Sequence, residues 1–221
     1  MSSRLEKGGI LINRDKTVEF SFDGKRMFGF NGDTLASALM ANGQTTVGRS
    51  FKYHRPRGLV ASGSEEPNGL VSTGETNSFE PNQKATTVEL FDNLKATSQN
   101  CWPSLGFDIG SVSSLIAKFI PAGFYYKTFI HPKPAWKHLF EPMIRRAAGL
   151  GNPPRHPDLD RYEHFYCHTD VLVIGGGLTG LTCAQQAGMS GAKTLLIEQA
   201  PVFGGRMLSD TDDISGITPQ S

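Results

Sequence analysis

The feature that most constrains the fold of this 221-residue chain is a glycine-rich turn near its C-terminal end. An apolar run at residues 171–174 is followed at once by the spacing Gly-x-Gly-x-x-Gly over residues 175–180. A helix-forming stretch to residue 190 and a second predicted strand at 193–197 come next. An uninterrupted apolar run is typical of a strand that is buried on both faces of a sheet. The pattern therefore predicts a strand–helix–strand unit whose first turn is made by the glycines.

Each glycine of this turn has a separate physical task. We expect Gly175 to permit the tight turn, Gly177 to let the backbone approach a pyrophosphate, and Gly180 to let the helix pack closely on the strand. The unpaired amides and the dipole at the start of a helix both favour a negatively charged group. The turn thus predicts a Rossmann-type site for an adenine dinucleotide.

Residues after the second strand extend this prediction. Glu198 follows the glycines by roughly 20 residues, where a carboxylate can accept hydrogen bonds from an adenosine ribose and would repel a 2′-phosphate. This favours NAD or FAD over NADP. The chain is then expected to return toward the cofactor at a second glycine pair, Gly204-Gly205. The guanidinium of the next residue, Arg206, could contact a phosphate. The predicted cofactor-binding residues are Gly175, Gly176, Gly177, Leu178, Thr179, Gly180, Glu198, Gln199, Gly205 and Arg206.

The N-terminal part of the chain has a different pattern. Residues 17–30 alternate apolar and polar side chains around Asp23-Gly24, which predicts a β-hairpin. Residues 35–41 follow the capping candidate Thr34 and end at Asn-Gly, which predicts a short helix. Residues 46–53 can form a strand that Pro56 ends. We therefore expect a small α+β module of the β-grasp kind.

Prolines and aromatic residues alternate between the two modules. We expect residues 101–165 to form a packed connector with short helices at 111–119 and 136–148, because the prolines exclude one long helix. The predicted division is 1–100 for the β-grasp module, 101–165 for the connector, and 166–221 for the start of the dinucleotide-binding domain. That domain needs a third strand at least, so we expect it to be truncated.

Composition excludes several classes of partner. The formal net charge is +1, from 22 Lys plus Arg and 21 Asp plus Glu, so no overall field attracts nucleic acid. The polar N-terminal stretch leads into no apolar segment, and no run of about 18 apolar residues occurs, so we expect neither a signal peptide nor a membrane span. Three scattered cysteines suit the cytoplasm. We find no spacing that predicts a metal site or a catalytic group, and expect catalysis to occur elsewhere.

Two stretches carry a resemblance to a known family. Residues 32–43 (Gly-Asp-Thr-Leu-Ala-Ser-Ala-Leu-Met-Ala-Asn-Gly) and residues 47–58 resemble the start of the alpha subunit of heterotetrameric sarcosine oxidase, within the two-dinucleotide-binding-domain flavoproteins. The likeness continues at residues 64–68. It implies a ferredoxin-like first domain, NAD in the dinucleotide domain, and beta, gamma and delta subunits as partners in the oxidative demethylation of sarcosine.

Related amine and amino-acid dehydrogenases hold a [2Fe–2S] cluster in the ferredoxin-like domain, and such clusters need four thiolates. The spacing C-x4-C-x2-C falls here on Ala61, Glu66 and Gly69, none of which is cysteine. We therefore expect no iron–sulfur cluster, and a ferredoxin-like module that serves as a scaffold or subunit interface.

Two other functions stay open. The chain could be the FAD-binding subunit of a dye-linked amino-acid dehydrogenase, which flavin absorbance would distinguish. It could also be a truncated, non-catalytic assembly fragment, which the reading frame beyond Ser221 would distinguish. In either case we expect the chain alone to be inactive.

Overall fold

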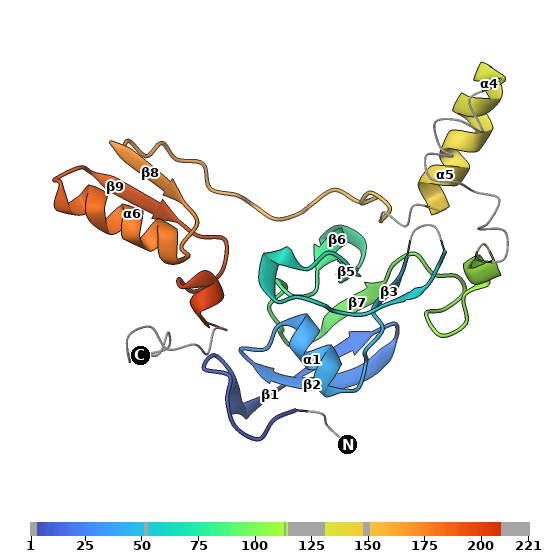
Figure 1. Ribbon diagram of the computed structural model, residues 1–221, viewed down its shortest axis with the longest axis horizontal. Helices are drawn as coiled ribbons and strands as arrows, with labels where there is room; N and C mark the ends of the chain where they lie inside the picture. Colours follow the sequence, from blue (N-terminus) through green and yellow to red (C-terminus); the bar gives the residue numbers. More distant parts are fainter. Residues whose placement is uncertain (1–3, 51–52, 113, 115–130, 148–150, 209–221) are drawn as a thin grey trace. The chain divides into compact units, whose positions relative to one another are not determined.

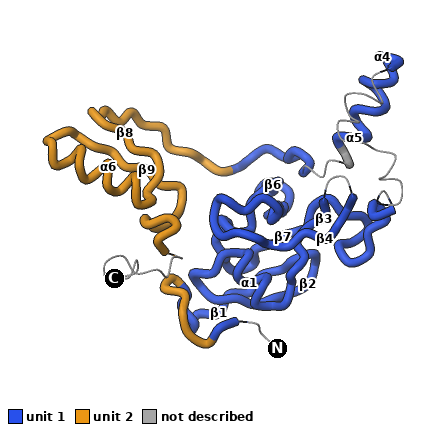
Figure 2. Tube along the Cα trace, in the orientation of Figure 1, with its two compact units in different colours: residues 1–5, 12–159 blue, residues 6–11, 160–221 orange. Residues whose placement is uncertain are grey.

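The computed structural model describes the chain except for residues 1–3, 51–52, 113, 115–130, 148–150 and 209–221 (Figure 1). Two compact units are distinguished by their internal contacts (Figure 2). The first unit contains residues 1–5 and 12–159, and the second contains residues 6–11 and 160–221. Each unit is described separately below.

A five-stranded mixed sheet forms the centre of the first unit, in the order β2-β1-β7-β5-β6 (Figure 1). Strands β1 and β7 are parallel, and the other neighbours are antiparallel. The strands are β1 (Asn13–Phe22), β2 (Lys25–Asn31), β5 (Leu70–Thr73), β6 (Glu80–Lys84) and β7 (Leu94–Ser98). A separate pair consists of β3 (Gly48–Arg49) and β4 (Pro56–Arg57).

The predicted hairpin is confirmed. Strands β1 and β2 pair from Thr17 to Phe30 around a two-residue turn. Asp23 and Gly24 have φ values of 49° and 75°, the positive values that a type I′ turn requires and that Asp-Gly accepts.

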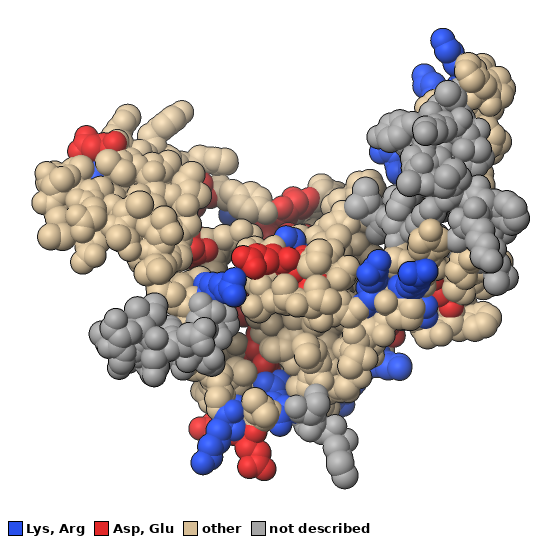
Figure 3. Space-filling view, in the orientation of Figure 1, with Lys and Arg blue, Asp and Glu red and all other residues tan. Residues whose placement is uncertain are grey.

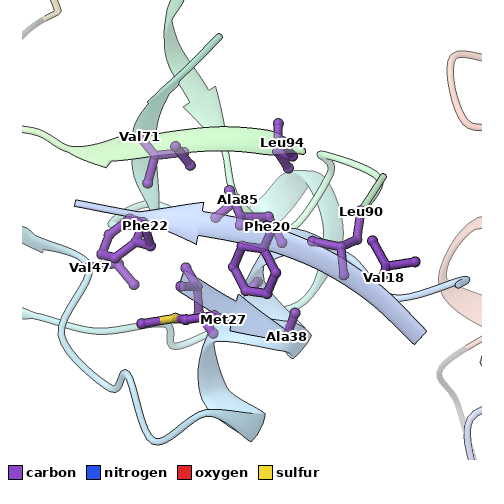
Figure 4. Packing of buried hydrophobic residues seen from close by; sticks show 14 of the residues in the cluster. Val18, Phe20, Phe22, Met27, Ala38, Val47, Val71, Ala85, Leu90 and Leu94 are labelled. Carbon is purple, nitrogen blue, oxygen red and sulfur yellow. The ribbon is translucent and has the colours of Figure 1, made fainter. Parts of the chain in front are cut away.

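The predicted first helix is also confirmed, as α1 (Leu35–Ala41). The hydroxyl of Thr34 accepts a hydrogen bond from the Ser37 amide at 3.2 Å, which satisfies one amide of the first turn. Leu35, Ala38 and Leu39 are fully buried. They pack with the sheet in one apolar cluster, part of which Figure 4 shows with β1 and β2 side chains around Phe20.

Among the described residues of the range 46–53, the predicted strand is observed at Gly48–Arg49. Pro56, which was expected to end a strand, instead pairs with Arg49. Strand β4 pairs with β3 as one edge of this two-stranded sheet, and proline is tolerated in an edge strand.

Short helices occupy the loops of the first unit: η1 (Gly63–Glu65), η2 (Thr76–Ser78) and η3 (Ile109–Val112). A longer helix runs through α4 (Lys133–Ala135), the π-helical η5 (Trp136–Phe140) and α5 (Glu141–Ala147), which confirms the helix predicted near 136–148. The wide π turn precedes Pro142, which cannot donate to the carbonyl four residues earlier. The helix predicted at 111–119 lies mostly outside the described residues.

The second unit contains β8 (Val171–Ile174), α6 (Leu178–Met189), β9 (Thr194–Ile197) and η6 (Gly205–Leu208). Strands β8 and β9 are parallel and in register from Val171↔Thr194 to Ile174↔Ile197. The helix contacts both strands.

The expectation that β8 is buried on both faces is wrong for the described part of the second unit. Leu172 and Ile174 are 50% and 80% exposed. The reason is that alternate side chains of β8 point to opposite faces, and α6 is the one helix that covers this two-stranded sheet among the described residues. Cys183 is exposed on α6.

Helix α6 lies close to the end of β8 at Gly180. A methyl group built on Gly180 would lie 1.8 Å from the carbonyl oxygen of Gly175, and within 3.5 Å of a Val173 methyl. No larger residue fits without moving the helix away from the strand.

None of the helices in the described ranges is long and apolar enough to cross a membrane. Lys and Arg side chains are interspersed with Asp and Glu side chains on the face shown in Figure 3. This distribution is the one expected from the near-zero net charge.

We predict opposite effects for two glycine-to-alanine changes in α6. Gly180→Ala should destabilise α6 by about 1–3 kcal/mol, because its methyl group overlaps the Gly175 carbonyl. Gly188→Ala should stabilise the helix by about 0.5–1 kcal/mol, since a methyl group there meets no atom within 4 Å. Amide hydrogen exchange in α6 measures both effects, and equal protection in the two variants would contradict the packing.

We predict that Cys101 reacts slowly with alkylating agents. Its thiol packs against the core of the first unit and lies 3.2 Å from the Ser98 hydroxyl, and burial raises the pKa of the thiol. The thiolate is the reactive form. Mass spectrometry after iodoacetamide treatment should show Cys167 and Cys183, both exposed, modified well before Cys101. All three should react alike in urea, and faster native reaction of Cys101 would show the burial to be wrong.

Candidate functional site

The predicted glycine turn lies at the junction between β8 and α6. Gly175 has a φ of 105°, which L-residues with side chains rarely adopt, and its amide donates to the Ile197 carbonyl at 2.7 Å. The carbonyl of Gly175 then lies directly against Gly180. Two of the three expected glycine tasks, the tight turn and the close helix packing, are therefore observed.

Gly177 is the residue that precedes the first turn of α6. It has φ −74° and ψ −177°, an extended conformation that any residue can adopt. A methyl group built on Gly177 meets no atom within 4 Å. The space beside Gly177 is therefore open, and Gly177 is not required by backbone conformation or by packing among the described residues.

Glu198 places its carboxylate against the same turn. One oxygen accepts from the Gly176 amide, and the other accepts from the amides of Gln199 at 2.7 Å and Ala200 at 2.9 Å. The amides of Ala200 and Gly176, with that of Gln199, lower the pKa of Glu198. The carboxylate is therefore charged at neutral pH and lies beside the glycines, as its position after β9 predicts.

The second glycine pair returns to the turn. The Gly204 amide donates to the Gly176 carbonyl at 2.8 Å, and Gly204 forms a parallel bridge with Gly177. A methyl group on Gly205 would lie 3.1 Å from the Gly177 Cα. Gly205 and Arg206 then open η6 with both residues exposed.

The structure thus brings the predicted residues of the second unit to one place, the end of β8. Leu178 and Thr179 lie exposed in the first turn of α6, and Gln199 is exposed beside Glu198. Their cofactor-binding roles stay predictions. Phe203 was not predicted, yet its ring lies closest to the position that a side chain at Gly176 would take. The position of Phe203 directly before the second glycine pair was the sequence feature that could have indicated this contact.

His54 in the first unit pairs with a carboxylate that is distant along the chain. Its Nδ1 lies 2.7 Å from an Asp108 carboxylate oxygen, and the ring is 14% exposed. The other Asp108 oxygen accepts from the amides of Trp102 and Gly110. No local pattern could predict a pair separated by 54 residues.

Two protein families match parts of the chain. Residues 15–101 match a family described as "2Fe-2S iron-sulfur cluster binding domain", and residues 170–212 match one described as "FAD dependent oxidoreductase". The first match agrees with the predicted ferredoxin-like module and with the mixed sheet and α1 observed there.

The first match also contradicts the expectation of no iron–sulfur cluster. That expectation depended on three positions of one spacing, Ala61, Glu66 and Gly69, whereas the match extends over residues 15–101. The three positions lie on one loop around η1. The module is therefore related to cluster-binding domains.

The side chains of this range were compared with the thiolates that such clusters use. Cys101 is the one cysteine within residues 15–101. The described residues contain no group of three or more His, Cys, Asp or Glu side chains arranged to hold a metal. This range supplies one of the four thiolates that such a cluster uses, and we assign none of its residues to cluster ligation.

Similar proteins include "Sarcosine oxidase subunit alpha" of Rhizobium meliloti (strain 1021), 54% identical over 97% of this chain and 22% of that protein. The protein of the same name from Corynebacterium sp. (strain U-96) is 31% identical over 97% of this chain and 18% of that protein. Among solved structures, an L-proline dehydrogenase from P. horikoshii gives a TM-score of 0.47 at 16% identity, over 96% of this chain and 31% of that chain.

The chain spans about a fifth of the length of the curated relatives that it matches. Their names describe them as subunits, so these relatives belong to assemblies of more than one chain. By its similarity over nearly all of its own length, the chain is a homologue of the N-terminal part of sarcosine oxidase subunit alpha.

Proposed function

We propose that the second unit is a Rossmann-type site that holds the adenosine diphosphate part of an adenine dinucleotide within an oxidoreductase. The observation that carries this proposal is the open space beside Gly177. A glycine that neither conformation nor packing requires is explained if a ligand approaches the backbone there.

The residues around the turn would divide the binding between them. The first-turn amides of α6 follow Gly177 directly, and there the helix dipole would favour a pyrophosphate. The carboxylate of Glu198 lies at the end of β9, where it can accept hydrogen bonds from ribose hydroxyls and repel a 2′-phosphate. Arg206, at the start of η6, would add a guanidinium contact to a phosphate.

The dinucleotide supplies hydride or electron transfer when it is bound. This chain's own residues position it. The turn at Gly175 orients the first amides of α6, and Gly180 allows the helix to lie close to β8. The hydrogen bond from the Gly204 amide to the Gly176 carbonyl stabilises the turn.

We propose NAD as the dinucleotide, from the resemblance to sarcosine oxidase alpha subunits. A second candidate is FAD, which the match of residues 170–212 to the FAD-dependent oxidoreductases favours. Both cofactors share the adenosine diphosphate that the glycine turn would recognise. A yellow purified protein with a flavin spectrum would support FAD, and a colourless protein that retains NAD would support NAD.

At the level of the whole protein, we propose a cytoplasmic complex that oxidises sarcosine, a CH–NH donor, with this chain contributing a cofactor-binding part and no catalytic residue. The basis is the 54% identity to a sarcosine oxidase subunit alpha. The alternative is a dye-linked amino-acid dehydrogenase. The substrate that the assembled enzyme oxidises would distinguish this alternative from a sarcosine oxidase.

We predict that Gly177→Ala folds normally but binds dinucleotide at least about tenfold more weakly, because its methyl group occupies the space that the pyrophosphate needs. NAD and FAD are titrated separately by calorimetry. Weak binding is expected even for the unaltered chain, since Ile174 and Leu172 leave one face of β8 exposed.

The matched control is Gly188→Ala, on the same helix but eleven positions away, which should leave the affinity unchanged. Circular dichroism checks that both variants are folded. Equal affinity of Gly177→Ala and the unaltered chain would contradict the proposed site, as would equal losses in both variants.

A further inference from the structure

Glu66 is a fully buried carboxylate in the first unit, with no exposed surface. The other buried carboxylates have basic partners: Asp33 pairs with Arg4, and Asp108 pairs with His54. Among the described residues, no ion pair joins Glu66 to a cation. A buried charge without hydrogen bonds would be very costly, so its partners decide what it does.

Those partners are backbone amides from both ends of one loop. One oxygen of Glu66 accepts from Val60 at 2.7 Å and from Ala61 at 2.8 Å. The other accepts from Asn68 at 2.6 Å. A single carboxylate therefore ties residues 60–61 to residue 68, and closes the loop that carries η1.

The fit around the side chain is tight. A methyl group built on Gly69 would lie 3.1 Å from the Glu66 Cγ and 2.6 Å from a Leu59 methyl. Burial by itself would raise the pKa of Glu66, but the amides of Ala61, Asn68 and Val60, with that of Gly69, lower it below its ordinary value. The carboxylate is therefore charged at neutral pH, and the loop solvates it in place of water.

The rest of the loop is anchored to the sheet through groups that do not involve the carboxylate. The Thr86 hydroxyl donates to the Gly63 carbonyl at 2.6 Å, and the Ala85 amide donates to the Gly69 carbonyl at 2.8 Å. These bonds hold one side of the loop. They leave the inward-facing amides of Val60, Ala61 and Asn68 with Glu66 as their acceptor.

We propose that the loop from Val60 to Gly69 is a built anion site for a small carboxylate, and that in this chain the resident anion is the side chain of Glu66. The amides converge on one carboxylate in the manner of a backbone anion nest. Glu66→Ala removes Cγ, Cδ and both oxygens, which are the heavy atoms of acetate. Acetate is therefore the probe that matches the vacated site.

The experiment measures amide hydrogen exchange over residues 60–69 of the full chain. In Glu66→Ala, exchange should accelerate at least about tenfold, because three buried amides lose their acceptor. Acetate should restore most of the protection, and chloride at the same ionic strength should not. Glu65→Ala, at the adjacent and exposed carboxylate, is the matched control and should accelerate the exchange far less than Glu66→Ala.

Glu66→Gln keeps the volume of the side chain but replaces one carboxylate oxygen with an NH2 group. That group is a hydrogen-bond donor, so it cannot accept from the amides that face it. Exchange in Glu66→Gln should also accelerate, without a response to acetate, because the site stays filled. If Glu66→Ala fails to fold, circular dichroism should show that acetate restores folding and chloride does not.

The proposal is overturned if acetate and chloride act alike on Glu66→Ala. It is also overturned if both Glu66 variants exchange like the unaltered chain, or if Glu65→Ala loosens the loop as much as Glu66→Ala.

Discussion

The contact between Gly180 and the Gly175 carbonyl is the constraint on which the candidate site depends. It sets the distance between α6 and β8, because an added methyl group would lie 1.8 Å from that carbonyl oxygen. This distance places the first amides of α6 at the end of β8. Glu198, which follows the parallel strand β9, and Gly204 can then both bond to Gly176. The absence of a side chain at Gly180 thus allows the glycine turn, the end of β9 and the second glycine pair to meet in one site.

The first unit depends on a different principle, the solvation of buried carboxylates by the protein itself. Two guanidinium nitrogens of Arg4 donate to Asp33 at 2.9 and 2.7 Å. Asp108 is satisfied by His54 and two amides, and Glu66 by three amides. In each case the carboxylate joins segments that are distant along the chain or opposite ends of a loop. Buried carboxylates therefore fix the loops around the sheet, while the apolar cluster holds the sheet to α1.

Local chemistry made some of these features predictable. Asp23-Gly24, the Thr34 cap and the glycine turn each specify backbone geometry within a few residues, and all three are observed. Strands β5 to β7 were not predicted, because their pairing depends on partners far along the chain. The exposure of Ile174 could not be read from an apolar run, since such a run shows that a strand can be buried and not what covers it. The cluster expectation was wrong because it depended on the cysteines at one spacing, whereas the match to cluster-binding domains extends over 87 residues.

The central claim is that the backbone of residues 175–180 binds a diphosphate. The most direct measurement is a titration of the ¹⁵N-labelled chain with ADP, followed by the amide resonances, which detects weak binding. The account predicts the largest shifts at the amides of residues 175–180 and at Glu198. Unchanged resonances there, or shifts confined to the first unit, would contradict it.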